Sequence, residues 1–171
     1  LWPTCYFPSI LYMIRKIRIT QRVMKKDGCE DMKQGSVTSK KQISLINQLY
    51  LGQTFEESNV MSRNIKTKLR SYRSQDLKKS RFDEINFIKY DDLLEKLVIC
   101  KLKCTYCRLP MLIMYQNKRE PTQWTLDRID NSTGHTNSNT VIACLKCNLE
   151  RRCINDQKFK FTKQMRLIKK K

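Results

Sequence analysis

Two pairs of cysteines carry the clearest chemistry in the sequence. Cys104 and Cys107 form one C-x-x-C pair, and Cys144 and Cys147 form a second. This spacing lets two thiolates of a pair reach one tetrahedral ion, and four thiolates at about 2.3 Å close the shell of Zn²⁺ without leaving a position for water. The sequence therefore predicts a structural zinc site that joins two distant segments of the chain.

The interval between the two pairs is too long for a simple zinc ribbon, so a folded insert is expected there. Its apolar runs predict strands at residues 112–115, 124–130 and 140–143, and Trp124 is expected to pack in the core. The sequence NSTG at 131–134 is typical of a turn, and residues 148–154 predict a helix. An α+β fold class follows.

The order strand, loop, strand, helix, with the sequence TLDRIDNSTGHTNSNTVIACLKCN, resembles the HNH nuclease family in its four-cysteine subclass. The resemblance covers roughly residues 103–152. It implies a small zinc-stapled ββα-metal domain over residues 98–157, preceded by a basic, largely helical N-terminal extension.

The resemblance also implies a set of catalytic residues. The family presents an acidic residue and then a general-base histidine on its first strand, and Asp127 and Arg128 stand at those positions here. It matches Asn139 to the residue that braces the loop and Asn148 to a metal ligand on the helix, so Asp127 and Asn148 are expected to share a catalytic Mg²⁺ or Mn²⁺. Such a cation, held by two protein oxygens, keeps positions for water and phosphate.

The identity of the general base stays open. An arginine cannot accept a proton, because its pKa lies above about 12 and it lacks an acceptor lone pair, so Arg128 is expected to contact phosphate. His135 is the only histidine, and an ordinary pKa of about 6.5 suits a base. If His135 is a loop residue without a catalytic role, metal-bound hydroxide or Asp130 would have to act, although Asp130 is equally typical of a turn.

The charge of the chain indicates its partner class. The formal net charge is +19, from 35 basic and 16 acidic residues, and a field of this sign favours nucleic acid. The resemblance to HNH nucleases makes double-stranded DNA the expected form. Four side chains are expected to contact phosphate: Arg128, Lys146, Arg151 and Arg152. Residues 158–171 form a basic tail that adds to this field.

The cysteine pairs, the hydropathy and the N-terminal charge bear on the location in the cell. Paired cysteines of this kind favour a reducing, intracellular compartment, with nuclear, cytoplasmic and viral-factory settings all open. No apolar run reaches the roughly 18–20 residues of a membrane span, so no membrane partner is expected. The basic, acid-free residues 13–26 are typical of a nucleic-acid-binding arm and also of a mitochondrial targeting segment.

The rest of the chain divides by composition into a basic arm and linker at residues 1–41 and a helical extension at 42–97. Within the extension, a short amphipathic helix is expected around residues 43–49 and one or two basic helices within 64–82. A further helix is expected from Tyr90, with Asp91 or Asp92 capping its first amide groups.

Three functions are consistent with these features. The first is a metal-dependent HNH-type endonuclease that hydrolyses phosphodiester bonds in DNA. The second is a catalytically inactive zinc-containing module that binds nucleic acid, motivated by Arg128 in the base position. The third is an RNA-associated protein of ribosomal type, which would leave the LDRIDN segment unexplained.

Overall fold

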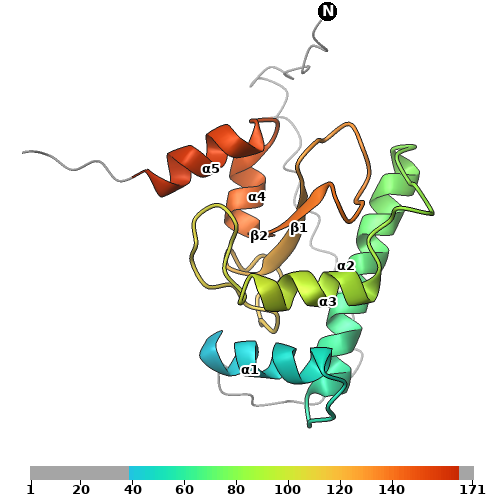
Figure 1. Ribbon diagram of the computed structural model, residues 1–171, viewed down its shortest axis with the longest axis vertical. Coiled ribbons are helices and arrows are strands. Elements are labelled where there is room, and N and C mark those ends of the chain that lie inside the picture. Colours follow the sequence, from blue (N-terminus) through green and yellow to red (C-terminus); the bar gives the residue numbers. More distant parts are fainter. Residues whose placement is uncertain (1–38, 166–171) are drawn as a thin grey trace, which may run out of the picture. The chain divides into compact units, whose positions relative to one another are not determined.

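The computed structural model describes residues 39–165. Seven elements follow one another along this part of the chain (Figure 1): α1 (Ser39–Tyr50), α2 (Ser58–Lys78), α3 (Tyr90–Ile99), β1 (Trp124–Arg128), β2 (Thr140–Cys144), α4 (Leu145–Arg151) and α5 (Asp156–Gln164). The basic stretch predicted at residues 13–26, and most of the arm and linker predicted at 1–41, lie outside the described part.

The strands form a two-stranded antiparallel sheet, which confirms the α+β class and two of the expected strands. Trp124 lies opposite Cys144, and Arg128 lies opposite Thr140. Helix α4 begins at the residue after β2 and packs against both strands. The third expected strand, at residues 112–115, is wrong: only an isolated bridge between Leu112 and Gln123 forms there, because no neighbouring strand extends the ladder.

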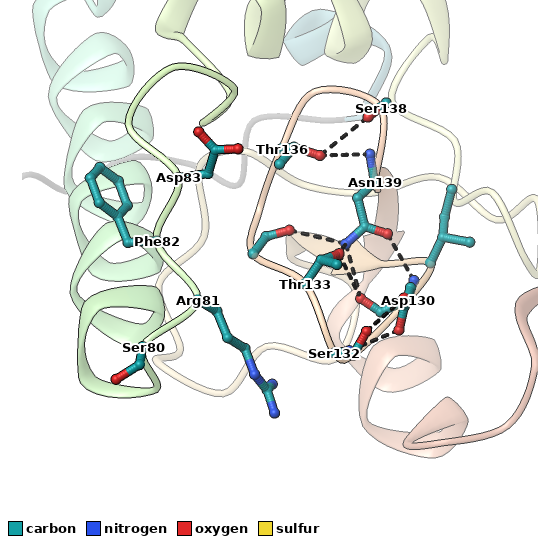
Figure 2. Close-up of a pocket in the computed structure, with 12 residues that line it drawn as sticks. Ser80, Arg81, Phe82, Asp83, Asp130, Ser132, Thr133, Thr136, Ser138 and Asn139 are labelled. Atoms are coloured by element: carbon teal, nitrogen blue, oxygen red, sulfur yellow. Dashed lines mark hydrogen bonds between the residues drawn. The ribbon is translucent and has the colours of Figure 1, made fainter. Parts of the chain in front are cut away.

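The loop between the strands is closed by one amide side chain, Asn139 (Figure 2). Its Nδ2 donates to the carbonyl oxygens of Asp130 and Gly134 at 2.9 and 3.0 Å and to Thr133 Oγ1 at 2.6 Å. Its Oδ1 accepts from the amide of Asp130 at 2.8 Å. One side chain thus satisfies backbone groups that a loop of this length would otherwise leave to solvent.

The helices of the extension form where the apolar spacing predicts them. Leu45 and Ile46 place the buried face of α1 against α3, and α3 in turn packs against β2. The basic region expected within 64–82 is the single helix α2. At the start of α3, Asp92 Oδ2 accepts from the amide of Lys89 at 3.3 Å.

One hydrophobic core serves both the helices and the cysteine segment. Leu93 and Leu97 of α3, Met61 of α2, Trp124 of β1 and Ile142 of β2 are all buried in it. Residues 39–165 accordingly belong to one compact unit. Helix α5 falls largely within the segment predicted as a basic tail.

No helix in residues 39–165 is both long and apolar enough to cross a membrane.

Candidate functional site

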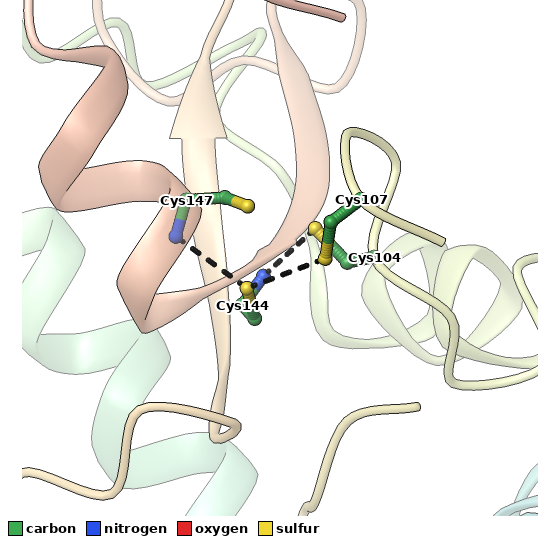
Figure 3. Close-up of side chains that lie close together, drawn as sticks. All are labelled: Cys104, Cys107, Cys144 and Cys147. Atoms are coloured by element: carbon green, nitrogen blue, oxygen red, sulfur yellow. Dashed lines mark hydrogen bonds between the residues drawn. The ribbon is translucent and has the colours of Figure 1, made fainter. Parts of the chain in front are cut away.

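The four cysteines of the two C-x-x-C pairs come together at the start of α4 (Figure 3). Their sulfur atoms all lie within 4.8 Å of one another, and three of the four side chains are buried. The Sγ atoms of Cys107 and Cys144 are 3.9 Å apart. Four thiolates at about 2.3 Å from a tetrahedral zinc ion stand about 3.8 Å from one another, so the cluster fits such an ion.

Backbone groups prepare the thiolates for a metal. The amide of Cys144 donates to Cys104 Sγ at 3.3 Å, and the amide of Cys147 donates to Cys144 Sγ at 3.4 Å. The hydrogen bond between the thiols of Cys104 and Cys144 lowers the pKa of Cys104 to about 5. The same bond raises the pKa of Cys144, and burial raises the pKa of Cys147 to about 12. Of these three thiols Cys104 alone favours the thiolate without a metal, and a bound metal would have to displace the protons of the other two.

The first C-x-x-C pair is also linked to β2 by hydrogen bonds from Thr105, which lies between its two cysteines. Thr105 donates through both its amide and its hydroxyl to the carbonyl oxygen of Ile142, at 3.0 and 2.8 Å. The residue after it, Tyr106, is 1% exposed and points its hydroxyl at Asp127 of β1, 2.6 Å from Oδ2. The metal cluster and the first strand are thus linked by a single buried side chain.

Asp127 is held in a buried ion pair with Arg151 of α4. Arg151 Nε lies 2.5 Å from Oδ2 and Nη2 lies 2.9 Å from Oδ1, with Asp127 3% and Arg151 2% exposed. Burial would lower the pKa of Arg151, but the hydrogen bond and charge of Asp127 outweigh it and raise that pKa. Burial, followed by the hydrogen bond to Asp127, raises the pKa of Tyr106.

Arg151 also holds the backbone around β1. Its guanidinium donates to the carbonyl oxygens of Arg128 at 2.5 Å and Ile154 at 2.8 Å. The expectation that Arg151 contacts DNA is therefore wrong, because its donors face the protein interior.

A cleft of about 420 Å³ lies beside this ion pair, where α2 approaches β1 and α4. It is lined by Tyr72, Gln75, Lys79, Arg81, Leu126, Asp127, Arg128, Asn131, His135, Asn148, Arg152 and Cys153. Four of these side chains are cations, and the only carboxylate among them, Asp127, is already paired with Arg151. The cleft is therefore suited to an anion.

His135 enters the cleft from the loop and is held by Asp76 of α2. Its Nδ1 lies 2.8 Å from Asp76 Oδ1, and its backbone amide donates to Asp76 Oδ2 at 2.7 Å. Burial lowers the pKa of His135 more than Asp76 raises it, so the ring is neutral at pH 7. Because the carboxylate accepts, Nδ1 carries the proton and Nε2 keeps its lone pair.

Nε2 of His135 makes no hydrogen bond within residues 39–165, and the residue is 4% exposed. His135 is among the residues that line the cleft. Asn148 reaches the same cleft: its Nδ2 donates to Thr125 Oγ1 and to the carbonyl of Leu126, at 3.0 and 3.2 Å, which leaves Oδ1 as its acceptor.

The structure separates the other residues from this cleft. Asn139 and Asp130 line a neighbouring pocket of about 660 Å³ (Figure 2), and Asp130 accepts from the amide and hydroxyl of Ser132 at 2.8 and 2.7 Å. Lys146 is exposed on α4 and is not among the residues lining the cleft. Arg128, His135, Asn148 and Arg152 do meet in it, together with Asp127.

The arrangement does not fit the divalent cation expected between Asp127 and Asn148. Both oxygens of Asp127 are engaged by Arg151, and Tyr106 adds a further donor. Asn148 would remain as one neutral ligand, whereas Mg²⁺ sites are normally built on carboxylates. The four-cysteine cluster therefore fits zinc, whereas Asp127 and Asn148 do not fit a divalent cation.

Sequence reasoning missed the contribution of α2 and the residues after it. Tyr72, Lys79 and Arg81 line the cleft, and Asp76, 1% exposed, positions His135. The sequence does contain a signal for the role of Asp76, because it is the only acidic residue between Ser58 and Phe82 in an otherwise basic segment. A lone carboxylate among cations is a reasonable partner for a distant polar residue.

Comparisons of the chain with protein-family models, with curated proteins and with solved structures found no significant match. The structure shows a small α+β protein with a four-cysteine cluster that can bind a metal such as zinc.

Proposed function

We propose that the protein binds nucleic acid, with double-stranded DNA as the first ligand to test, by seating a backbone phosphate in the cation-lined cleft. The observation that carries this proposal is the charge of the cleft. Lys79, Arg81, Arg128 and Arg152 line it, while its single carboxylate is neutralised from inside the protein. In this proposal zinc shapes the module, and the segment directly after α2 supplies two of the four cations, Lys79 and Arg81.

Arg128 is held in place for such a contact. Its side chain is 15% exposed, its Nη1 donates to the carbonyl of Thr133 at 3.2 Å, and the same nitrogen lies 3.9 Å from Asp76. Burial lowers the pKa of Arg128, which shows that its charge is poorly solvated, and a phosphate would relieve that cost. An ordered guanidinium can bind phosphate with two parallel hydrogen bonds.

Fluorescence anisotropy with a labelled duplex, at several salt concentrations, tests the proposal. Arg81→Gln and Arg152→Gln should each weaken binding and reduce the slope of log K against log salt by about 0.9. Arg119→Gln, which removes an exposed arginine from the segment 116–123 outside the cleft, is the matched control. Equal losses in all three variants would mean that the cleft is not the binding site, and a preference for structured RNA over duplex DNA would favour an RNA-associated protein.

Endonuclease activity is a second candidate, favoured by one specific observation. His135 lines the same cleft, its Nε2 has no hydrogen-bond partner within residues 39–165, and Asp76 fixes its tautomer, which is the arrangement of an oriented general base. Conversion of supercoiled plasmid to nicked circles, with and without Mg²⁺ or Mn²⁺, measures this activity. Activity that is lost in His135→Ala but kept in Arg119→Gln would support it, and intact plasmid under conditions of full binding would exclude it.

A further inference from the structure

We infer that Arg151 is an internal replacement for a divalent cation at Asp127, so that the cleft binds nucleic-acid phosphate without a divalent metal. This inference rests on the proposed function and concerns its cofactor requirement. It follows from how the charges around Asp127 are arranged, from the protein interior outward to the cleft.

The guanidinium of Arg151 supplies what a cation at this position would supply. It faces both carboxylate oxygens of Asp127, at 2.5 and 2.9 Å, and a metal ion would bind that carboxylate through the same lone pairs. Its remaining donors face the carbonyls of Arg128 and Ile154 and the side chain of Asn131. Its positive charge is thus compensated and its donors are satisfied, which makes the pair stable without any ligand.

Replacing Arg151 by a metal would be costly. The ion would have to displace a buried guanidinium, 2% exposed, and would leave Nε of Arg151 without Asp127, the only acceptor that it has within residues 39–165. It would also enter a cleft already lined by Lys79, Arg81, Arg128 and Arg152, whose charges repel a divalent cation. The same charges attract a phosphate. Side chains therefore supply the positive charge that a divalent cation would otherwise bring to this site.

Asn148 fits this arrangement as a neutral contact. Its Nδ2 is engaged by Thr125 and Leu126 of β1, so the side chain is oriented and Oδ1 faces away from those partners. An amide oxygen in a cation-lined cleft can accept from one of the neighbouring guanidinium groups or from a water molecule that also contacts phosphate. No metal is needed to explain its position.

The first experiment measures metal binding without nucleic acid. Zinc-loaded protein, freed of other metals by passage through metal-free buffer and checked for retained zinc, is titrated with Mn²⁺ and followed by electron paramagnetic resonance. The spectrum of the free ion should be unchanged by the wild-type protein. Stoichiometric loss of the free-ion signal, restored by Asp127→Asn, would overturn the inference.

Two variants sharpen this measurement. Arg151→Gln frees the carboxylate of Asp127 and should create Mn²⁺ binding that the wild type lacks. Arg152→Gln removes a neighbouring cleft cation but leaves the ion pair intact, so it should gain none. If Arg151→Gln does not fold, the wild-type titration still decides the question.

The second experiment measures duplex binding in metal-free buffer and in millimolar Mg²⁺. We expect Mg²⁺ to weaken binding, because it competes with the protein's cations for the phosphates. Binding that appears only with Mg²⁺ would overturn the inference while supporting the proposed function. Absence of binding in both buffers would instead refute the proposed function, and the Mn²⁺ titration would still report on the ion pair.

Discussion

Asp127→Asn should cost the protein much of its stability, because it leaves Arg151 charged and buried without its partner. The substitution keeps the shape of the side chain and removes only the charge. Asp127 is 3% and Arg151 2% exposed, so solvent cannot compensate. Removing one partner of a buried pair costs about 3–5 kcal/mol, against a total stability of about 5–15 kcal/mol for a small domain.

Urea unfolding of the zinc-loaded protein, followed by circular dichroism, measures this loss. With a slope of about 2 kcal/mol per molar urea, the midpoint should fall by about 2 M. Asp130→Asn is the control, since that carboxylate is exposed and its change should stay within about 0.5 kcal/mol. A change of that small size in Asp127→Asn would refute the buried-pair reasoning and would return Asp127 to the role of a metal ligand.

A double variant tests whether the stability lost in Asp127→Asn comes from the unpaired charge of Arg151. Asp127→Asn combined with Arg151→Gln removes both charges, so it should be more stable than Asp127→Asn alone. Additive losses from the two substitutions would show that the charges act independently.

Three further predictions concern the surroundings of the cleft. Cys107→Ser should abolish zinc binding and leave the module unfolded near 37 °C, as measured by metal content and circular dichroism; a folded, zinc-free variant would contradict a structural role. Gly134→Ala should destabilise the protein by about 1–3 kcal/mol in urea, because the new Cβ would lie 2.3 Å from the carbonyl oxygen of Arg81, whereas Ser138→Ala in the same loop should be nearly neutral. The pKa of His135 is lowered in the folded state from its ordinary 6.5, so the unfolded chain takes up the proton first and the free energy of unfolding should fall as the pH drops below 6.5. His135→Gln should remove this part of the pH dependence. An unchanged pH profile of stability in that variant would contradict the prediction.

The local elements and the metal cluster could be predicted from the sequence, because each depends on residues close together in the chain. The C-x-x-C spacing fixes which thiolates can share an ion, and short apolar runs indicate β1 and β2. Residues 112–115, which were predicted as a strand but do not form one, have a similar composition; a strand also needs a partner with free backbone groups, and composition does not indicate such a partner.

The cleft could be predicted only in part. The resemblance to the HNH family drew attention to Arg128 and Asn148, and His135 was singled out as the only histidine; the structure brings these three side chains to one place. It could not indicate that Arg151, three residues after Asn148 on the same helix, turns inward and takes both oxygens of Asp127. On a helix surface either direction is open to an arginine; the burial of Asp127 decides it.

The residues themselves determined that this protein is basic, that four cysteines can bind one metal, and that a strand, a loop, a strand and a helix lie around them. Only the tertiary structure decided which charges remain available to a ligand. Asp76 and Arg81 both lie more than fifty residues before His135 in the chain, yet Asp76 holds His135 and Arg81 lines the cleft with it, because α2 packs against β1 and the loop. Pairing of buried charges depends on which side chains share the interior, and sequence spacing does not contain that information.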